Sequence, residues 1–395
     1  MPNPVEPRRT PQNLCLLTLL VLCIAASGRA QQTSDFTPLF NGRDLSGWVN
    51  VNCAPETWSV REGMIHSTGK PICELRTDRM YENFVLELEY THLVPGGNAG
   101  VFIWGDALTA RGQPFVRAIE IQVLDGQETA NYTSHGDIFP IHGATMTPDR
   151  PHPAGWARSL PSERRARPAG EWNHYRITAD KGTVTLAVNG KEVSGGYDIS
   201  PRKGYIHLES EGGVVQWRNL RVRELPSAGV LPPALVAEED QGFKTLYTGT
   251  DFRGWRHSTA HEGRWVSKDW IIAADGKGDA EGDVLWTEGV FGDVSLIVDW
   301  RWTDKGPDGD VLPISVAGAE LPAEARALVA RELVSRSASG QWHRALLRIQ
   351  GGRLSLTLDG VDVFADIPLA GGKNAPVGLR HSGRRLEFAN IFVRE

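Results

Sequence analysis

The stretch Ala118-Ile119-Glu120-Ile121-Gln122-Val123-Leu124-Asp125 decides how the rest of the chain is interpreted. It alternates with a period of two, so the isoleucines and the valine would fall on one face of a strand and Glu120 and Gln122 on the other. Asp125 breaks the alternation, and a one-residue bulge would turn its carboxylate back beside Glu120 and Gln122. The pattern predicts a strand of an antiparallel sheet with one buried face. The other face is either an ordinary solvated surface or the polar floor of a cleft.

Two parts of the chain repeat one pattern in the same order. Leu39–Trp48 recurs as Leu246–Trp255, and Trp217-Arg218-Asn219-Leu220 recurs as Phe388-Ala389-Asn390-Ile391. The repeat unit is far longer than the roughly 20–50 residues of repeat arrays, so the pattern indicates a domain duplication. The second copy has no counterpart of the Glu-Ile-Gln-Val strand.

Each copy consists of short alternating segments separated by turn residues. Phe84–Tyr90 and Thr183–Val188 alternate clearly, and Asn189-Gly190 after the second of them is a hairpin signal. Many short strands at regular spacing predict an all-β fold with a sandwich or jelly roll in each copy. The helix candidate is the Ala-rich stretch from Pro322 to about Val334. Asn131–Pro168 has few strand signals and is expected to be a loop over the sheet.

The first 30 residues have the composition of an export signal. Arg8 and Arg9 precede an apolar run from Leu14 to Ala26, which is too short to span a bilayer comfortably and is followed by small residues suited to cleavage. We therefore expect an exported protein, periplasmic or extracellular, with no stable membrane insertion after the signal is removed.

The chain is expected to have four parts. Residues 1–30 are the signal peptide, and residues 31–226 form the first sandwich. Residues 227–242, with Pro232-Pro233, form an extended linker, and residues 243–395 form the second sandwich. A chain of 395 residues has room for two such domains.

Composition argues against nucleic acid as a partner and leaves open whether the two cysteines pair. The net charge of −6 argues against a general nucleic-acid-binding protein. After removal of the signal only Cys53 and Cys73 remain, and either a disulfide or two buried free thiols fits an exported protein. Two cysteines without nearby histidines do not make a zinc site.

Several motifs resemble those of the 3-keto-disaccharide hydrolase domain family. They occur in the family's order and cover about Phe36 to Leu225, whereas the second copy is similar at its ends and degenerate in its middle. The resemblance implies a concanavalin-A-like or laminin-G-like jelly roll in each copy, a bacterial origin and a carbohydrate partner. The motifs are Phe40–Trp48, Gly96–Phe102, Glu120–Asp125, Pro168–Asn173 and Trp217–Val222.

The stretch Glu120–Asp125 is also similar to the Glu-x-Asp-x-x-Glu strand of jelly-roll β-glucanases. In those enzymes the first carboxylate is the nucleophile and the last is the acid. Here Gln122 replaces the middle Asp, and Asp125 is one methylene shorter than the Glu it replaces. These departures disfavour ordinary retaining glycosidase chemistry.

The family resemblance implies a particular reaction. The C2 hydrogen of a 3-keto glycoside is acidic, so a base can remove it and the C1 leaving group can then depart; addition of water completes the net hydrolysis. This route needs a base, a group that stabilises the enolate oxygen, and an acid for the leaving group. The candidate catalytic residues are Glu120, Asp125 and His142.

A second set of residues is expected to bind the substrate. Gln122 lies one same-face step from Glu120, and two late-strand residues, His207 and Glu209, share one face. Tryptophans are candidate sugar-stacking platforms, although core packing is the simpler explanation for a tryptophan within a strand. The full set is Asn98, Trp104, Gln122, His135, Trp156, His207 and Glu209.

No cofactor is demanded by the spacing of these residues. Glu120, Asp125, His142 and Glu209 could together hold a divalent cation, because carboxylates and imidazoles are its usual ligands. We therefore leave a divalent metal ion as an open expectation.

Three functions fit this sequence. The first is hydrolysis or elimination at the glycosyl bond of a keto-sugar glycoside. The alternatives are a pair of non-catalytic carbohydrate-binding modules and a retaining β-glucanase-like glycoside hydrolase.

Overall fold

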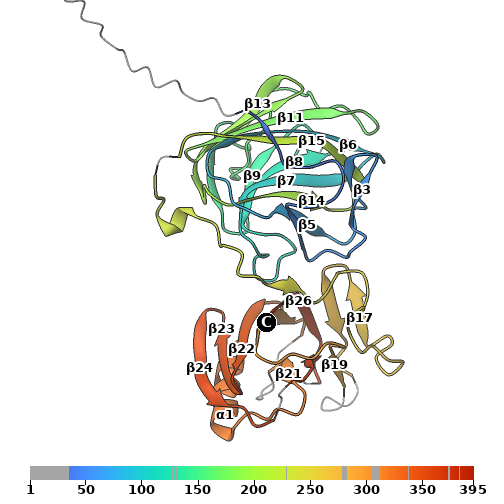
Figure 1. The fold of residues 1–395 in the computed structure, drawn as a ribbon, viewed down its shortest axis with the longest axis vertical. Coiled ribbons are helices and arrows are strands. Elements are labelled where there is room, and N and C mark those ends of the chain that lie inside the picture. The colour runs from blue at the N-terminus through green and yellow to red at the C-terminus, as the bar shows by residue number, and fades with distance from the viewer. Residues whose placement is uncertain are drawn as a thin grey trace, which may run out of the picture. The chain divides into compact units, whose positions relative to one another are not determined.

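The computed structural model describes residues 35–395 except 127, 128, 130, 131, 228, 278–282, 305–311, 337, 372, 373 and 382. The expected export signal, residues 1–30, lies outside the described residues. In the described part, four antiparallel sheets pair into two sandwiches (Figure 1). The fold is therefore all-β, with two jelly-roll sandwiches in tandem, as the strand pattern predicts.

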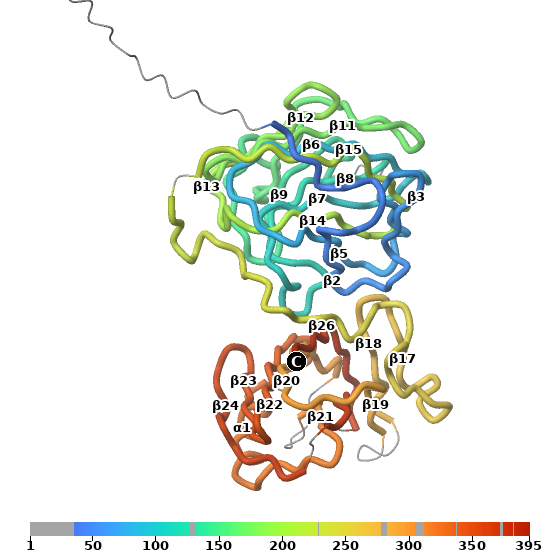
Figure 2. The backbone as a smooth tube through the Cα atoms, viewed as in Figure 1, coloured from blue at the N-terminus to red at the C-terminus, as the bar shows by residue number. Residues whose placement is uncertain are grey.

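The first sandwich pairs a nine-stranded sheet with a six-stranded sheet. The larger sheet contains β1 (Thr37–Pro38), β3 (Trp58–Arg61), β4 (Met64–Ser67), β6 (Phe84–His92), β10 (Thr145–Pro148), β11 (Asn173–Asp180), β12 (Thr183–Val188), β13 (Lys191–Ser200) and β15 (Val215–Glu224). The smaller sheet has the order β2 (Trp48–Val51), β5 (Cys73–Thr77), β14 (Tyr205–Ser210), β7 (Asn98–Gly105), β8 (Ala118–Leu124) and β9 (Ile138–Ile141), and Figure 2 shows these strands side by side.

The inner faces of these two sheets form one apolar core. Ile119, Ile121 and Val123 of β8 have no exposed surface and belong to one cluster with Leu86 and Leu88 of β6. Each such side chain contributes about 1.5–3 kcal/mol when it leaves water. A one-residue slip would turn all three inward residues of β8 to the outside, so the core fixes the register. The two polar residues between them must then lie on the outer face.

The second sandwich pairs an eight-stranded sheet with a three-stranded sheet. The larger sheet contains β16 (Lys244–Thr245), β17 (Trp265–Lys268), β18 (Ile271–Ala274), β20 (Val294–Trp302), β22 (His343–Gln350), β23 (Arg353–Leu358), β24 (Val361–Pro368) and β26 (Leu386–Arg394). The smaller sheet has β19 (Val284–Trp286), β21 (Ile314–Val316) and β25 (Val377–Arg380). Helix α1 (Ala323–Ser335) forms where the Ala-rich stretch predicts it, and it buries Ala325, Val329 and Leu333.

The two large sheets have the same strand order and the same register. In the first, β6 pairs with β11 on one side and β15 on the other; in the second, β20 pairs with β22 and β26. Asn219 of β15 and Asn390 of β26 both have a left-handed backbone, with φ of 54° and 50°, at the irregularity in each pairing. The structural equivalence agrees with the sequence repeat.

Two connections differ from what the sequence predicts. The segment Asn131–Pro168 is not one long loop, because it contains β9 and β10, which extend opposite sheets. The linker is not a free spacer either. It includes a short 3-10 helix, Pro233–Leu235, and its Asp240 carboxylate accepts a hydrogen bond of 2.6 Å from Arg76 of β5.

The two cysteines of the described part are free thiols. Both are buried; Cys53 Sγ donates to the Glu74 carbonyl oxygen at 3.0 Å and accepts from Trp58 Nε1 at 3.1 Å. Burial raises the pKa of the Cys73 thiol well above its ordinary value. Among the described residues, no helix combines the length and the apolar composition that a membrane crossing requires.

The core of the first sandwich can be tested at Ile121. Replacing this fully buried side chain in Ile121→Ala should lower the free energy of unfolding by about 2–5 kcal/mol, because the change removes three carbons and leaves a cavity. Val94, which is 55% exposed, provides the control, and Val94→Ala should change it by less than about 0.5 kcal/mol. Denaturant unfolding followed by tryptophan fluorescence gives both values, and equal losses would contradict the packing described here.

Candidate functional site

The outer face of the six-stranded sheet carries a row of acidic and aromatic side chains. Glu120 of β8 pairs with Phe102 of β7, which pairs with His207 of β14. One step along the strands, Glu209 of β14 pairs with Glu74 of β5. Period-two alternation puts all of these side chains on one face. The face is buried rather than solvated, since Glu120 is only 6% exposed and Glu209 only 1%.

Two of these carboxyl groups converge above Gly100 of β7. A Cβ placed on Gly100 would lie 2.8 Å from Glu209 Oε2 and 3.2 Å from Glu120 Oε1. Any side chain at this position would therefore push one or both carboxyls away. The absence of a side chain at Gly100 lets an oxygen of Glu209, an oxygen of Glu120 and the edge of the Phe102 ring come together over this strand.

Burial controls the protonation of this pair. It raises the pKa of Glu120 to about 8; the nearby Glu211 carboxylate adds to the rise, and the guanidinium of Arg158 opposes it. Burial also raises the pKa of Glu209 well above its ordinary value, and the charges of Glu120 and Glu211 raise it further. Both carboxyls therefore tend to hold protons at neutral pH, a state in which ordinary glutamates are ionised.

Glu74 and His207 form a second buried pair beside the first. Glu74 Oε2 lies 2.6 Å from His207 Nδ1, and neither side chain has any exposed surface. The other oxygen of Glu74 accepts a hydrogen bond of 2.7 Å from the backbone N–H of Val116. His207 Nε2 faces the backbone at Gly105, where an added Cβ would be only 2.4 Å away. The imidazole is thus enclosed by the sheet and its loop.

Hydrogen bonds of two side-chain amides link the acidic cluster to its half-exposed edge. Gln122 Nε2 donates to Asn98 Oδ1 at 2.7 Å, and Asn98 Nδ2 in turn donates to Glu211. Burial raises the pKa of Glu211, while hydrogen bonds with Glu209 and Asn98 lower it. Asn98 and Glu211 are both half-buried, so the acidic face reaches solvent on this side.

A cation and two aromatic rings lie at the β9 side of the same face. The guanidinium of Arg158 is centred 3.5 Å from the Phe139 ring centroid and 5.8 Å from that of Tyr132. Arg158 also forms an ion pair of 2.9 Å with the fully buried carboxylate of Asp137. Since Phe139 pairs with Glu120, this arginine brings a positive charge near the carboxyl pair.

The first sandwich matches the model of a known domain family. Residues 35–223 match the model of the 3-keto-alpha-glucoside-1,2-lyase-like domain. This segment is a 3-keto-alpha-glucoside-1,2-lyase-like domain. The match ends before the linker, and we call this part of the chain the lyase-like domain below.

Individual relatives are more distant. The 3-keto-disaccharide hydrolase of Bacteroides thetaiotaomicron is 26% identical over 176 residues, which are 40% of this chain and 57% of that protein. The match thus spans little more than half the length of that relative. Among solved structures, the Bacillus licheniformis β-glucanase is 14% identical with a TM-score of 0.34, over 49% of this chain and 98% of that one. The carbohydrate-binding module CBM66 of Bacillus subtilis is 12% identical with a TM-score of 0.34, over 45% and 96%.

Asp125 does not join the carboxyl cluster of the lyase-like domain. Strand β8 ends at Leu124 without the expected bulge, and Asp125 turns away into the neighbouring loops. Its two oxygens accept hydrogen bonds from the backbone N–H groups of Gly96, at 2.9 Å, and Ala169, at 3.0 Å. The expected acid is therefore a residue that joins two loops, and Glu209 takes the place beside Glu120.

The two candidate loop histidines also lie apart from the carboxyl pair. His135 Nδ1 accepts a hydrogen bond of 3.2 Å from the backbone N–H of Ala166. His142 follows β9 with a left-handed backbone and stacks on Phe115 at a centroid distance of 6.5 Å. Burial lowers the pKa of His142, so it is neutral at physiological pH. The Phe115 ring in turn contacts that of Phe102 at a centroid distance of 5.5 Å.

The two candidate tryptophans differ in position. Trp104 is wrong as a sugar platform, because it is fully buried in the core and its Nε1 donates to the Glu82 carbonyl oxygen at 2.7 Å. Trp156 is 44% exposed and stacks on His152 with centroids 4.6 Å apart. It is two residues from Arg158, so its loop is part of the edge of the site.

The four residues expected to hold a divalent cation are not brought together. Asp125 and His142 have the separate contacts described above, which leaves Glu120 and Glu209. Within the part of the chain that the structure describes, no three His, Cys, Asp or Glu side chains are arranged to hold a metal ion.

Sequence reasoning missed several residues of the site, namely Glu74, Gly100, Arg158 and Glu211. Glu211 could have been found, since it continues the two-residue step of His207 and Glu209. Gly100 lies within the motif Gly96–Phe102, but its place between the two carboxyls depends on strand pairing. Glu74 and Arg158 are brought to the site by strand pairing and by a loop, and their local sequence carries no signal of this.

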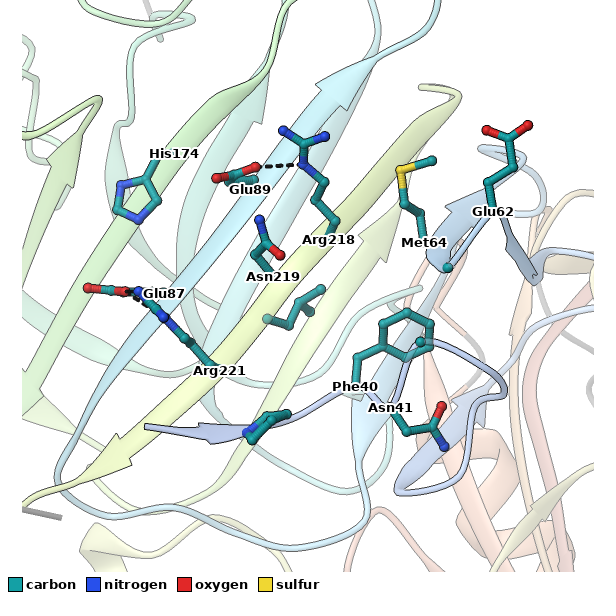
Figure 3. Close-up of a pocket in the computed structure, with 14 residues that line it drawn as sticks. Phe40, Asn41, Glu62, Met64, Glu87, Glu89, His174, Arg218, Asn219 and Arg221 are labelled. Atoms are coloured by element: carbon teal, nitrogen blue, oxygen red, sulfur yellow. Dashed lines mark hydrogen bonds and ion pairs between the residues drawn. The ribbon is translucent and has the colours of Figure 1, made fainter. Parts of the chain in front are cut away.

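A hollow lies on the outer face of the nine-stranded sheet of the same domain. It has a volume of about 750 Å³, and Figure 3 shows the charged side chains that line it. Glu89 accepts from Arg218 at 2.6 Å, and Glu87 pairs with both Arg176 and Arg221. Glu87 and Glu89 are each paired with arginine, and Glu89 is partly exposed, so we place the chemistry at the buried acidic face instead.

The meeting of the two carboxyls over Gly100 can be tested by substitution. Gly100→Ala should lower the free energy of unfolding by about 1–3 kcal/mol, because its Cβ must displace Glu209 or Glu120 in a packed face. Gly289 is a matched control, since its nearest neighbour to an added Cβ is at an ordinary 3.5 Å. Denaturant unfolding of both variants measures the difference, and a harmless Gly100→Ala would show that the carboxyls do not meet there.

The raised pKa of Glu120 predicts a dependence of stability on pH. The folded chain keeps a proton up to about pH 8 that the unfolded chain releases near pH 4.5. This stabilising contribution is complete below pH 4.5 and is lost as the pH rises to about 8, so the free energy of unfolding should fall across that range. Glu120→Gln is neutral throughout and should show a shallower fall. Denaturant unfolding at intervals from pH 5 to 9 measures the slopes, and identical slopes would mean that Glu120 titrates normally.

Proposed function

We propose that the lyase-like domain cleaves the glycosidic bond of 3-keto glycosides by elimination followed by hydration. The observation that carries this proposal is the pair of buried carboxyls, Glu120 and Glu209, whose oxygens come together over Gly100. The family match and the name of the Bacteroides relative support a carbohydrate substrate of this kind.

The two carboxyls suit the two proton transfers of the reaction. We assign Glu120 as the base that takes the C2 hydrogen, because a carboxylate with a pKa of about 8 is a stronger base than an ordinary one. Burial raises the pKa of Glu209 well above its ordinary value, so Glu209 holds a proton that it can give to the oxygen of the leaving group as the C1–O bond breaks. Water then adds to C1 of the unsaturated product, and a proton returns to C2, which completes net hydrolysis.

Neighbouring groups supply the remaining functions. Loss of the C2 hydrogen places negative charge on the oxygen of the 3-keto group, and Arg158 is the cation that the site offers to stabilise it. Asn98 and Gln122 present amide groups at the half-exposed edge, where they can hydrogen-bond sugar hydroxyls. Tyr132 and Phe139 add apolar surface for a sugar ring.

The retaining β-glucanase alternative has less support. Its acid would be Asp125, whose oxygens are both engaged by backbone N–H groups. Its middle carboxylate is replaced by Gln122, which is hydrogen-bonded to Asn98. A non-catalytic binding module would not need two carboxyls with raised pKa values, since their burial costs stability.

The composition of residues 1–30 leads us to propose export as well. An N-terminus near Gln31 in protein purified from its native source would support this, and an intact Met1 would contradict it.

Glu120→Gln tests the assignment of the base. Turnover of a 3-keto-disaccharide should fall about 10²–10⁴-fold, the usual effect of losing a positioned acid–base group. Substrate affinity should change much less, because the amide has the same volume and still forms hydrogen bonds. In the native protein kcat/KM should rise with pH to a plateau above about 8, because the base must be ionised.

The isotope content of the product separates the routes. In heavy water the released sugar should carry deuterium at C2, which direct displacement at C1 would not introduce. A product without C2 deuterium, together with an inactive Glu120→Gln, would favour the glucanase-like route. Binding without turnover of keto or ordinary disaccharides would favour the binding module. Glu89→Gln, on the opposite sheet, is the matched control and should keep full activity.

A further inference from the structure

The loop between β7 and β8, residues 106–117, connects the acidic face to the second sandwich. Its ends are joined by Asp106 and Arg117, which form two hydrogen bonds of 2.8 and 3.0 Å. The same aspartate accepts a hydrogen bond of 2.7 Å from the backbone N–H of Glu238 in the linker. The base of the loop is therefore fixed, and what remains to be explained is how its middle is held.

The C-terminal part of this loop touches the site directly. The N–H of Val116 donates to Glu74 at 2.7 Å, and Glu74 contacts His207. Phe115 packs edge-on against Phe102, with centroids 5.5 Å apart, and Phe102 pairs with Glu120. A shift of the loop would therefore remove a hydrogen bond from Glu74 and open the apolar cover beside Glu120.

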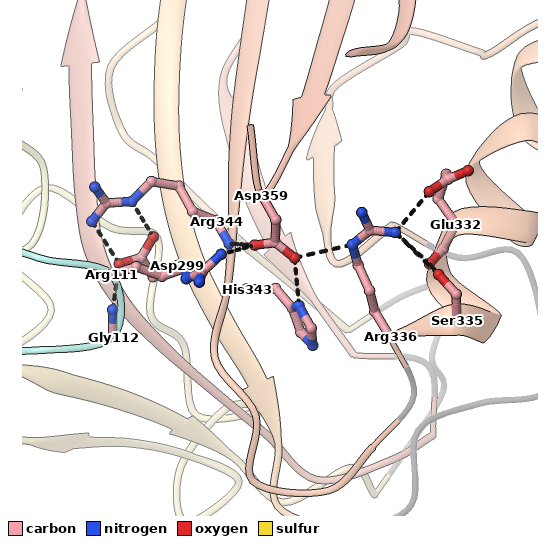
Figure 4. Close-up of polar contacts among 9 residues, drawn as sticks. All are labelled: Arg111, Gly112, Asp299, Glu332, Ser335, Arg336, His343, Arg344 and Asp359. Atoms are coloured by element: carbon pink, nitrogen blue, oxygen red, sulfur yellow. Dashed lines mark hydrogen bonds and ion pairs between the residues drawn. The ribbon is translucent and has the colours of Figure 1, made fainter. Parts of the chain in front are cut away.

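The N-terminal part of the loop is held by the second sandwich. The N–H of Gly112 donates to Asp299 Oδ2 at 2.7 Å, as Figure 4 shows. Arg344 donates to the Thr109 carbonyl oxygen at 2.9 Å. Asn390 Nδ2 lies 2.9 Å from the carbonyl oxygen of Ala110 and 3.0 Å from that of Gln113. Three residues of the second sandwich thus bind four backbone groups of the loop, those of Thr109, Ala110, Gly112 and Gln113.

Asp299 is the centre of this attachment. It has no exposed surface, and Arg344 binds both of its oxygens, at 2.6 and 2.8 Å. Asn390 donates to the same carboxylate at 2.8 Å. A buried carboxylate with this many donors has a fixed position, so it is a rigid acceptor for the N–H of Gly112.

Gly112 is required for the close approach of the loop. It has a φ of 65°, and a Cβ built on it would lie 2.1 Å from Cγ of Trp342. Only glycine combines this backbone with this contact. An apolar contact adds to the attachment, because Val51 of β2 packs with Ile297 and Phe392 of the second sandwich.

Among the described residues, the equivalent positions of the lyase-like domain bind no loop in this way. Asp299, Arg344 and Asn390 correspond in strand register to Glu89, His174 and Asn219, which line the open hollow of Figure 3. The attachment is therefore not a general feature of the sandwich. Within the described part of the chain, it is the second sandwich that uses this sheet face to bind a loop.

We propose that Asp299, Arg344 and Asn390 of the second sandwich are positioning residues for the acidic site of the lyase-like domain. They fix residues 109–113, and the loop in turn places Phe115 and the N–H of Val116 against the acidic face. The second sandwich is thus a part of the working site rather than an independent module. Only the activity readout below rests on the proposed function.

Two variants of the full chain test this inference. Asp299→Asn removes the charge that holds the loop, and Gly112→Ala forces the loop away from Trp342 while leaving the second sandwich intact. In both, the Val116 amide should exchange with solvent at least about tenfold faster, and the titration midpoint of Glu120 should move down from about 8 as water enters. Hydrogen exchange and carbon-13 NMR of glutamate side chains give these values.

Activity provides a separate readout. The value of kcat/KM on a 3-keto-disaccharide should fall about tenfold to a hundredfold, which is the scale for misplaced catalytic groups. Glu89→Gln is the matched control, because Glu89 occupies the position of Asp299 in the other copy; it should leave exchange, titration and activity unchanged.

The outcomes distinguish this inference from the proposed function. Native exchange at Val116 and a native Glu120 titration in both folded variants would overturn the positioning role. If Asp299→Asn fails to fold, Gly112→Ala alone decides the question. If the native protein does not cleave keto-glycosides, the proposed function fails, while the exchange and titration results still confirm or overturn the coupling.

Discussion

The burial of several glutamates on one sheet face is the constraint on which this site depends. An isolated carboxylate inside a protein is costly, so it must take up a proton, gain a partner or accept hydrogen bonds. Glu120 and Glu209 keep protons, and Glu74 has His207 and the N–H of Val116. In addition to burial, the charge of Glu211 and that of Glu74 raise the pKa of both Glu120 and Glu209, so the protonation of the group is coupled. A face of this kind requires a fixed cover, and such a cover needs support from outside the sheet.

Sequence periodicity could predict the strand at the centre of the site but not its neighbours. The alternation of β8 placed Ile119, Ile121 and Val123 in the core, and the structure agrees. It also placed Glu120 and Gln122 on the other face, and the same step of two joined His207 to Glu209. Glu74 and Gly100 each become neighbours of Glu209 through cross-strand register, which depends on how distant segments pair. Asp125 was misplaced because the strand ends one residue earlier, where two backbone N–H groups satisfy the carboxylate.

The two large sheets pair their central strands in the same order but differ in the character of their outer faces. Glu87, Arg176 and Arg221 in the first copy stand where Ile297, Leu346 and Phe392 stand in the second. The charged set forms ion pairs that remain partly exposed, and such pairs contribute little to stability. The apolar set packs against Val51 of the lyase-like domain, where removal from water favours a lasting contact. The same strand framework thus gives a solvated face in one copy and an interface in the other.

This asymmetry explains why a copy without the acidic strand is still useful. The small sheet of the second sandwich has three described strands against six in the first. Its large sheet holds the loop mainly through backbone groups, to which the ion pair of Arg111 with Asp359 adds a side-chain contact. A carboxyl pair with raised pKa values needs rigid, dry surroundings more than additional ligands. By fixing residues 109–113, the second sandwich supports the cover of such a pair without touching the pair itself.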